Sequence, residues 1–224
     1  MRLSPILLLL AAASVSACAP RGGAAPTPAP LTPAAQVLAD SLRLPYTKAD
    51  VTFMTEMVGH HAQAILISRW APTHGADTSL RILAARIINA QMDDINLMRQ
   101  WLRDRGKPLP SVTSDGVFTP APADSTDEHA GHDMGDHSAM AGMLTPAQLT
   151  ELDSKHGEEF AILFLQRMIN HHRGAVTMVQ TLIRDSGAID ETVFRFAADV
   201  EVDQSTEIRR MLQMLLERGG TPPE

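Results

Sequence analysis

One pattern of aromatic, thioether and imidazole side chains occurs twice in the sequence, about 111 residues apart. The first copy contains Phe53, Met57, His60, His61 and Ala64, and the second contains their counterparts Phe164, Met168, His171, His172 and Ala175. Counted from the Phe, these residues fall at positions i, i+4, i+7, i+8 and i+11, which share one face of an α-helix. A repeated apolar face needs a partner to cover it, so the duplication constrains the fold strongly.

Each copy is followed by a second segment with helical periodicity, in which Gln91, Ile95, Met98 and Leu102 correspond to Gln204, Ile208, Met211 and Leu215. Capping residues and helix-ending Gly and Pro predict long helices at about 47–70, 78–105, 158–185 and 190–218, with a shorter one after Thr145. We find no alternating strand pattern. The sequence therefore predicts an all-α fold, an antiparallel four-helix bundle (46–219) made of two repeated hairpins, residues 46–106 and 145–219.

The first 17 residues have the composition of an export signal. Arg2 precedes an apolar run over residues 6–13, well short of the roughly 20 residues that span a membrane, and small residues follow it. The sequence Val15-Ser16-Ala17-Cys18 resembles the lipobox of bacterial lipoproteins, in which the Cys is lipidated, and Ala19 favours sorting to the outer membrane. An ordinary cleaved signal that leaves Cys18 unused is the alternative. The Pro-rich segment 18–45 cannot form a core and is expected to be a tether.

Residues 108–144 connect the hairpins, and their composition suits metal binding. From Pro108 to Ser154 the chain has eight acidic residues and no Lys or Arg. Three His and three Met lie among Gly and Ala there: His129, His132, Met134, His137, Met140 and Met143. Such a segment can wrap around a cation but cannot build a hydrophobic core, so we expect these six residues to bind metal. A solvated acidic linker is the alternative.

The repeated helical face is a second candidate metal site. Its side chains come from both hairpins: Met57, His60, His61, Met98, Met168, His171, His172 and Met211. Thioether and imidazole ligands suit Cu(I) and tolerate Cu(II), whereas Mg²⁺, Ca²⁺ and Mn²⁺ prefer oxygen ligands. The alternative is an ordinary core in which these His are hydrogen-bonded to Gln91, Gln204, Asp94 or Glu207. The two His near predicted helix ends, His74 and His156, are expected at the surface or in caps.

The doubled motif is specific enough to suggest a family. Phe-x3-Met-x2-His-His-x2-Ala, followed in each copy by Gln-x3-Ile-x2-Met, resembles a bacterial family known only as a domain of unknown function, over about residues 47–219. The resemblance implies a ferritin-like four-helix bundle, export from the cytoplasm and, in the best-understood relatives, copper binding. Members usually carry an Asp three residues before the Phe. Asp50 matches this position, but Ala161 stands there in the second copy.

The remaining composition excludes several classes of function. The net charge of −7 argues against nucleic-acid binding, and the single Cys excludes thiolate clusters and covalent c-type haem. No Glu-x-x-His occurs, so a ferritin-type di-iron centre is not expected. We therefore predict a non-enzymatic, lipid-anchored protein of the cell envelope that binds Cu(I) or Cu(II). A metal-free structural or interaction bundle is the alternative, and an enzyme that oxidises Cu(I) is a third hypothesis.

Overall fold

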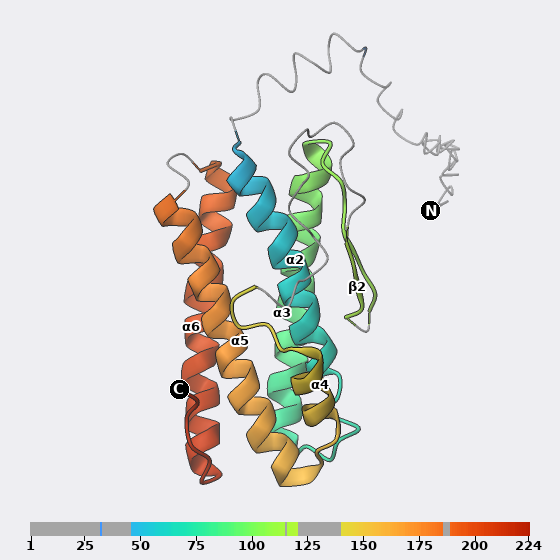
Figure 1. Ribbon diagram of the computed structural model, residues 1–224, viewed down its shortest axis with the longest axis vertical. Helices are drawn as coiled ribbons and strands as arrows, with labels where there is room; N and C mark the ends of the chain where they lie inside the picture. Colours follow the sequence, from blue (N-terminus) through green and yellow to red (C-terminus); the bar gives the residue numbers. More distant parts are fainter. Residues whose placement is uncertain (1–31, 33–45, 115, 121–139, 186–188) are drawn as a thin grey trace, which may run out of the picture. The chain divides into compact units, whose positions relative to one another are not determined.

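The computed structural model describes residues 32, 46–114, 116–120, 140–185 and 189–224 (Figure 1). The predicted signal peptide with Cys18, most of the tether, and His129, His132, Met134 and His137 lie outside the described residues. The described residues form five α-helices and one two-stranded sheet. None of these helices is long and apolar enough to cross a membrane.

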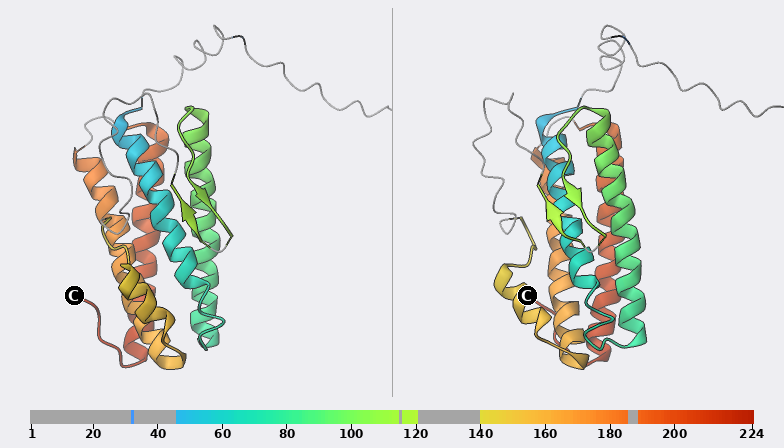
Figure 2. Two further views of the ribbon diagram at one scale, coloured as in Figure 1. Left: turned by 45° about the vertical axis from the view of Figure 1, so that its right-hand side comes forward. Right: turned by 90° about the vertical axis from the view of Figure 1, so that its right-hand side faces the viewer.

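Four long helices form the bundle. The first hairpin consists of α2 (Lys48–Ser68) and α3 (Thr78–Asp104), and the second of α5 (Gly157–Asp185) and α6 (Glu191–Glu217). The four helices run side by side, with α2 against α5 between the hairpins (Figure 1, Figure 2). The short helix α4 (Pro146–Asp153) packs on α5. The predicted all-α bundle is confirmed, and the ends of the long helices differ from the predicted ones by at most two residues.

Local side-chain signals fix the ends of these helices. Thr47 and Thr145 each begin a helix with a capping box, and Asp77 and Asp190 accept hydrogen bonds from backbone N–H groups in the first turns of α3 and α6. Gly106 and Gly219 follow the ends of α3 and α6 with φ of +64° and +71°. A side chain at either position would be strained, and this is why Gly stops both helices.

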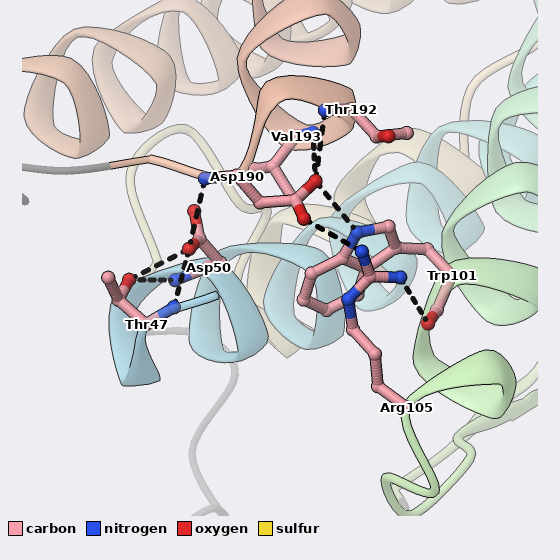
Figure 3. Close-up of polar contacts among 7 residues, drawn as sticks. All are labelled: Thr47, Asp50, Trp101, Arg105, Asp190, Thr192 and Val193. Carbon is pink, nitrogen blue, oxygen red and sulfur yellow. Dashed lines mark hydrogen bonds and ion pairs between the residues drawn. The ribbon is translucent and has the colours of Figure 1, made fainter. Parts of the chain in front are cut away.

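A network of buried carboxylates joins three helices at one end of the bundle (Figure 3). Asp50 accepts hydrogen bonds from Thr47 N at 2.7 Å and from Asp190 N at 3.3 Å. Asp190 in turn accepts from Trp101 Nε1 at 3.2 Å and from Arg105 at 2.7 Å. Burial opposes ionisation of Asp190, but the hydrogen bonds from Trp101 and Arg105 outweigh it and lower its pKa. Asp50 therefore ties the start of α2 to the start of α6.

The connector contains a small β-hairpin that no alternating pattern in the sequence had indicated. β1 (Ser111–Val112) pairs with β2 (Phe118–Thr119) in antiparallel register. Gly116 lies so close to α2 that a Cβ there would sit 2.5 Å from the backbone nitrogen of Leu66. The Phe118 ring is 3.3 Å from the point where a Cβ of Gly59 would lie. Two glycines thus allow the hairpin to pack closely on α2, although its strands are too short to give a sequence pattern.

The hydrophobic core consists of two clusters, which we name after one Phe in each. The Phe164 cluster contains residues 64–71 of α2 and its continuation, 80–87 of α3, 160–169 of α5 and 211–215 of α6. The Phe53 cluster contains residues 53–58 and Ile65 of α2, 95–102 of α3, 175–182 of α5 and 193–200 of α6. On α3, α5 and α6 a short stretch of sequence separates the two clusters, and on α2 residues 59–63 do so, although Ile65 of the Phe53 cluster lies beyond them, between Ala64 and Ile67 of the Phe164 cluster.

Candidate metal centre

Six buried polar side chains occupy these separating stretches. They are His60 and His61 on α2, Gln91 on α3, His171 and His172 on α5, and Gln204 on α6, and none is more than 4% exposed. We call them the His/Gln layer. Each hairpin contributes a His pair from its first helix and a Gln from its second, as the repeat predicts. The layer is therefore a band of hydrogen-bonding groups between two apolar clusters.

The four Met predicted as ligands are completely buried, but they belong to the apolar clusters. Met57 and Met98 lie in the Phe53 cluster, and Met168 and Met211 lie in the Phe164 cluster. Met57 precedes the His pair of α2 by three and four residues, and Met168 does so on α5. This spacing places each thioether one helical turn from two imidazoles. The helices therefore bring sulfur and nitrogen donors to neighbouring positions.

The two hairpins place their histidines in equivalent ways. His60 and His171, the first His of each pair, pack against each other across the hairpin interface, with ring centroids 3.9 Å apart and ring planes tilted by 39°. The second His of each pair contacts a carboxylate of its own hairpin. His61 Nε2 lies 3.1 Å from Asp94 Oδ2, and His172 Nε2 lies 2.7 Å from Glu207 Oε2. The expected hydrogen bonds to Asp94 and Glu207 are thus present.

Many other polar atoms of the layer have no hydrogen-bond partner among the described residues. These atoms are Nδ1 of His61, Nδ1 of His172, both ring nitrogens of His171, both amide atoms of Gln91, and Oε1 of Gln204. A buried polar atom without a partner costs about 1–3 kcal/mol. Because such atoms are rare in folded proteins, their concentration in one layer makes the layer the candidate ligand site of the described fold.

Burial keeps the central imidazoles uncharged. Burial, and then the neighbouring His61, lowers the pKa of His60 to about 3, and the carbonyl of Ala141 offsets this only in part. Burial, and then His60 and His172, lowers the pKa of His171 well below its usual value. Both rings are therefore neutral at pH 7, so each has one nitrogen lone pair that could bind a metal without displacing a proton.

The end of the connector reaches this layer. His60 Nε2 lies 3.1 Å from the carbonyl oxygen of Ala141, and Gln63 exchanges two hydrogen bonds with Leu144, at 2.9 Å and 2.7 Å. Gly142 has φ of +79°, and a Cβ on Gly174 of α5 would overlap the Ala141 carbonyl. Met140 and Met143, two of the predicted connector ligands, are half-buried in this segment. The 140–144 segment therefore places the end of the connector beside His60.

Sequence reasoning missed these connector contacts and the burial of one histidine. His74 was expected at the surface or in a cap, and it contacts a carbonyl in the turn after α2 as a capping residue would, but it is only 8% exposed. Its Nδ1 lies 3.0 Å from the Trp70 carbonyl, and its Nε2 lies 2.9 Å from the Asp153 carbonyl. Its ring also stacks on exposed His156. His74 joins the turn after α2 to the end of α4, a contact across 79 residues that has no local sequence signal.

The donor set favours a metal that accepts few ligands. No group of three or more His, Cys, Asp or Glu side chains in the described part of the chain is arranged to hold a metal ion. A closed tetrahedral zinc site would need four such ligands. Cu(I) and Ag(I) bind with two or three soft ligands, so an imidazole and a thioether are enough. The residues of the layer and the adjacent Met therefore fit a monovalent soft metal best.

Comparison with protein families identifies the chain. The family profile of DUF305, a domain of unknown function, matches residues 50–215, which include the whole His/Gln layer. The chain belongs to the DUF305 family. The family resemblance of the doubled motif is thereby confirmed, and the paired hairpins described above are the DUF305 domain of this chain. No functionally curated protein is significantly similar to the chain.

Several solved structures resemble this DUF305 protein. A DUF305 protein from Streptomyces coelicolor is 29% identical, with a TM-score of 0.62, and the match covers 79% of this chain and 97% of that one. A DUF305 fragment from Deinococcus radiodurans is 28% identical, with a TM-score of 0.61 and coverage of 78% and 99%. CopM in its Cu(II)-bound form is 26% identical, with a TM-score of 0.54 and coverage of 75% and 96%. CopM has also been crystallised in Cu(I)-bound, Ag-bound and apo forms.

Proposed function

We propose that the protein binds copper in the cell envelope and sequesters it without catalysing a reaction. The observation that carries this proposal is the His/Gln layer, in which buried imidazole nitrogens have no hydrogen-bond partner among the described residues. A fold built only for stability would not concentrate such atoms in one place. CopM, a relative at 26% identity, has been crystallised with bound Cu(II), which supports copper as the metal.

The proposed ligands belong to two groups. In the bundle they are the stripe residues Met57, His60, His61, Met98, Met168, His171, His172 and Met211. In the connector they are His129, His132, Met134, His137, Met140 and Met143, of which the last two lie next to the layer. Because the connector ends beside His60, an ion captured by connector residues could pass into the bundle without leaving the protein.

We further propose that the protein acts outside the cytoplasm, anchored through lipid on Cys18 to the outer membrane, facing the periplasm or the cell surface. The lipobox-like sequence before Cys18 supports the anchor, and the Streptomyces coelicolor relative is provisionally described as secreted. Thiols form disulfides in such compartments, whereas thioethers still bind Cu(I). This chemistry accounts for a ligand set that contains Met and no Cys in the bundle.

A structural or interaction bundle is the second candidate. The hydrogen bonds of His61 to Asp94 and of His172 to Glu207 favour it, because hydrogen-bonded histidines occur in ordinary cores. The two candidates differ over His171, whose ring nitrogens have no partner in the described fold. If the layer is purely structural, an apolar ring at position 171 should increase the free energy of unfolding and should leave metal binding by the protein unchanged.

The deciding experiment is an anaerobic titration of the protein with Cu(I) and Ag(I) against a chromogenic chelator. We expect binding with a dissociation constant below about 1 μM, which corresponds to about 8 kcal/mol. The proposal would be overturned if neither Cu(I) nor Ag(I) bound at this level. His171→Phe keeps a flat ring against His60, so we expect an unchanged or increased free energy of unfolding but at least tenfold weaker binding at the bundle site.

His156→Phe is the matched control. It makes the same substitution at an exposed His outside the His/Gln layer, so it should change neither the affinity nor the number of bound equivalents. If His171→Phe bound metal as tightly as the unmodified protein, the layer would not be the bundle site. A structural role would then be preferred for the layer, and metal binding would be assigned to the connector.

A further inference from the structure

Three imidazoles of the His/Gln layer direct the same ring nitrogen toward an oxygen that can only accept a hydrogen bond. Nε2 of His61 faces the Asp94 carboxylate, Nε2 of His172 faces the Glu207 carboxylate, and Nε2 of His60 faces the Ala141 carbonyl. Since neither an ionised carboxylate nor a carbonyl can donate, the proton of each ring must be on Nε2. This proton assignment leaves Nδ1 as the nitrogen that can offer a lone pair.

The free nitrogens have the environment that this assignment requires. Nδ1 of His61 and Nδ1 of His172 are shielded from solvent and have no hydrogen-bond partner in the described fold. Both rings are completely buried, so water cannot satisfy these atoms from the surface. A proton on Nδ1 would be a buried donor without an acceptor, at a cost of about 1–3 kcal/mol. A lone pair on Nδ1 is the arrangement that a metal ion can use.

The carboxylates occur twice at equivalent positions, which argues against chance. Asp94 follows Gln91 by three residues, and Glu207 follows Gln204 by three residues. The two residues differ in length by one methylene, yet both reach the second His of their own hairpin. Burial, and then the nearby charges of Asp94 and Glu207, raises the pKa of Asp203. Asp94, Asp203 and Glu207 therefore lie close together on the bundle, and their negative charge favours a proton on the Nε2 atoms of His61 and His172.

We propose that Asp94 and Glu207 are positioning residues that hold His61 and His172 with the proton on Nε2, so that these two imidazoles ligate the metal through Nδ1. The inference rests on the proposed function and adds the donor atoms and the residues that select them. A carboxylate that accepts the N–H of a ligating His fixes the orientation of the ring and makes its other nitrogen a stronger donor. His171 has no carboxylate partner of this kind, so no carboxylate selects which of its ring nitrogens has the proton.

The test is a long-range ¹H–¹⁵N correlation spectrum of the whole protein, recorded without metal and then with Ag(I), which is diamagnetic. The cross-peak pattern of each imidazole distinguishes Nδ1 from Nε2. Without metal, we expect His60, His61 and His172 to have the proton on Nε2. With Ag(I), we expect the Nδ1 resonances of His61 and His172 to shift, while their Nε2 atoms remain protonated.

Variants test the positioning role separately. The double substitution Asp94→Ala with Glu207→Ala should mix the two tautomers of His61 and His172 and weaken Ag(I) binding about 10- to 100-fold. The exchange Asp94→Glu with Glu207→Asp keeps both carboxylates and should restore most of the affinity. Asp93→Ala removes an exposed acid from the same helix and should change neither the tautomers nor the affinity. Circular dichroism of each variant verifies that the bundle is folded.

The possible outcomes separate the two proposals. If the unmodified protein takes up no Ag(I) or Cu(I), the proposed function fails, and the assignment of metal-binding atoms fails with it. If metal binds but shifts Nε2 of His61 and His172, or neither ring, the proposed function stands and this inference is wrong. If the metal-free protein has the proton on Nδ1 of these two rings, the inference is wrong whether or not the protein binds metal.

Discussion

At the scale of single residues, the closely packed pair His60 and His171 predicts how the protein responds to acid. Their ring centroids are 3.9 Å apart. A charged imidazole at either position would lack the hydration that stabilises it in water, and charges on both rings would repel each other. The pKa of His60 is about 3, and the pKa of His171 is also lowered. In the unfolded chain both would titrate near the ordinary value of about 6.5. The native and unfolded states therefore bind different numbers of protons in mildly acidic solution.

This difference predicts acid sensitivity of the metal-free protein. Below about pH 6.5 the unfolded chain binds protons that the native layer refuses, so the free energy of unfolding should fall as the pH falls, by up to about 1.4 kcal/mol per pH unit for each histidine. Urea denaturation at pH 7, 6 and 5 measures this slope above the range where most carboxylates titrate. His171→Phe should have a shallower slope. Equal slopes in the two proteins would show that the layer is not the cause.

Contacts at single residues were predictable where the helical repeat fixes them. Helical spacing places Asp94 and Glu207 one turn beyond Gln91 and Gln204, so their contacts with the paired His could be anticipated. The Ala141 carbonyl could not, because it is backbone and lies 81 residues from His60 in the sequence. The role of Asp50 was equally hidden. Its contact with Asp190 spans 140 residues and depends on how the hairpins pack.

At the scale of secondary-structure elements, α5 and the 140–144 segment depend on one glycine. The apolar periodicity of α5 was readable in the sequence, but nothing in the sequence around Gly174 indicated its role inside that helix. The Ala141 carbonyl occupies the space that a side chain at position 174 would need. That carbonyl also lies within hydrogen-bonding distance of His60 Nε2. Gly174 therefore sets how closely the end of the connector can approach the His/Gln layer.

Gly174→Ala is expected to destabilise the protein although Ala favours helix. The higher helix propensity of Ala would by itself increase the free energy of unfolding by about 1 kcal/mol. However, the new methyl group would overlap Ala141 and push the 140–144 segment away, which lowers the free energy of unfolding by about 1–3 kcal/mol. Urea denaturation gives the net change, and the imidazole signals of His60 should move as its hydrogen bond lengthens. In Gly59→Ala, the control, the new methyl meets only the Phe118 ring, from 3.3 Å, so the free energy should change by less than about 1 kcal/mol. A stabilised Gly174→Ala protein would contradict this account.

At the scale of the whole molecule, charge and fold divide the proposed ligands into two kinds. Residues 108–154 contain eight acids and no base, whereas the rest of the chain after residue 17 has eighteen of each. The acidic stretch therefore attracts cations, whereas the charges of the rest of the chain after residue 17 cancel. Ligands within residues 129–137 are close in sequence and can meet one ion in the folded or the unfolded chain. The ligands of the His/Gln layer come from separate helices and meet only when the bundle folds.

This division predicts that only the layer couples metal binding to stability. A ligand that binds the native state alone stabilises by about 2.7 kcal/mol at 100 times its dissociation constant, which for a domain of this size raises Tm by about 5–10 °C. A variant with His129→Asn, His132→Asn, His137→Asn and Met134→Leu should bind fewer equivalents of Ag(I) but keep this rise. His171→Phe should keep the connector equivalents and lose the rise. Calorimetry with metal analysis measures both quantities. A site that binds both states equally cannot shift Tm, so loss of the rise in the connector variant would show that the connector ligands bind the native state preferentially and would contradict this division.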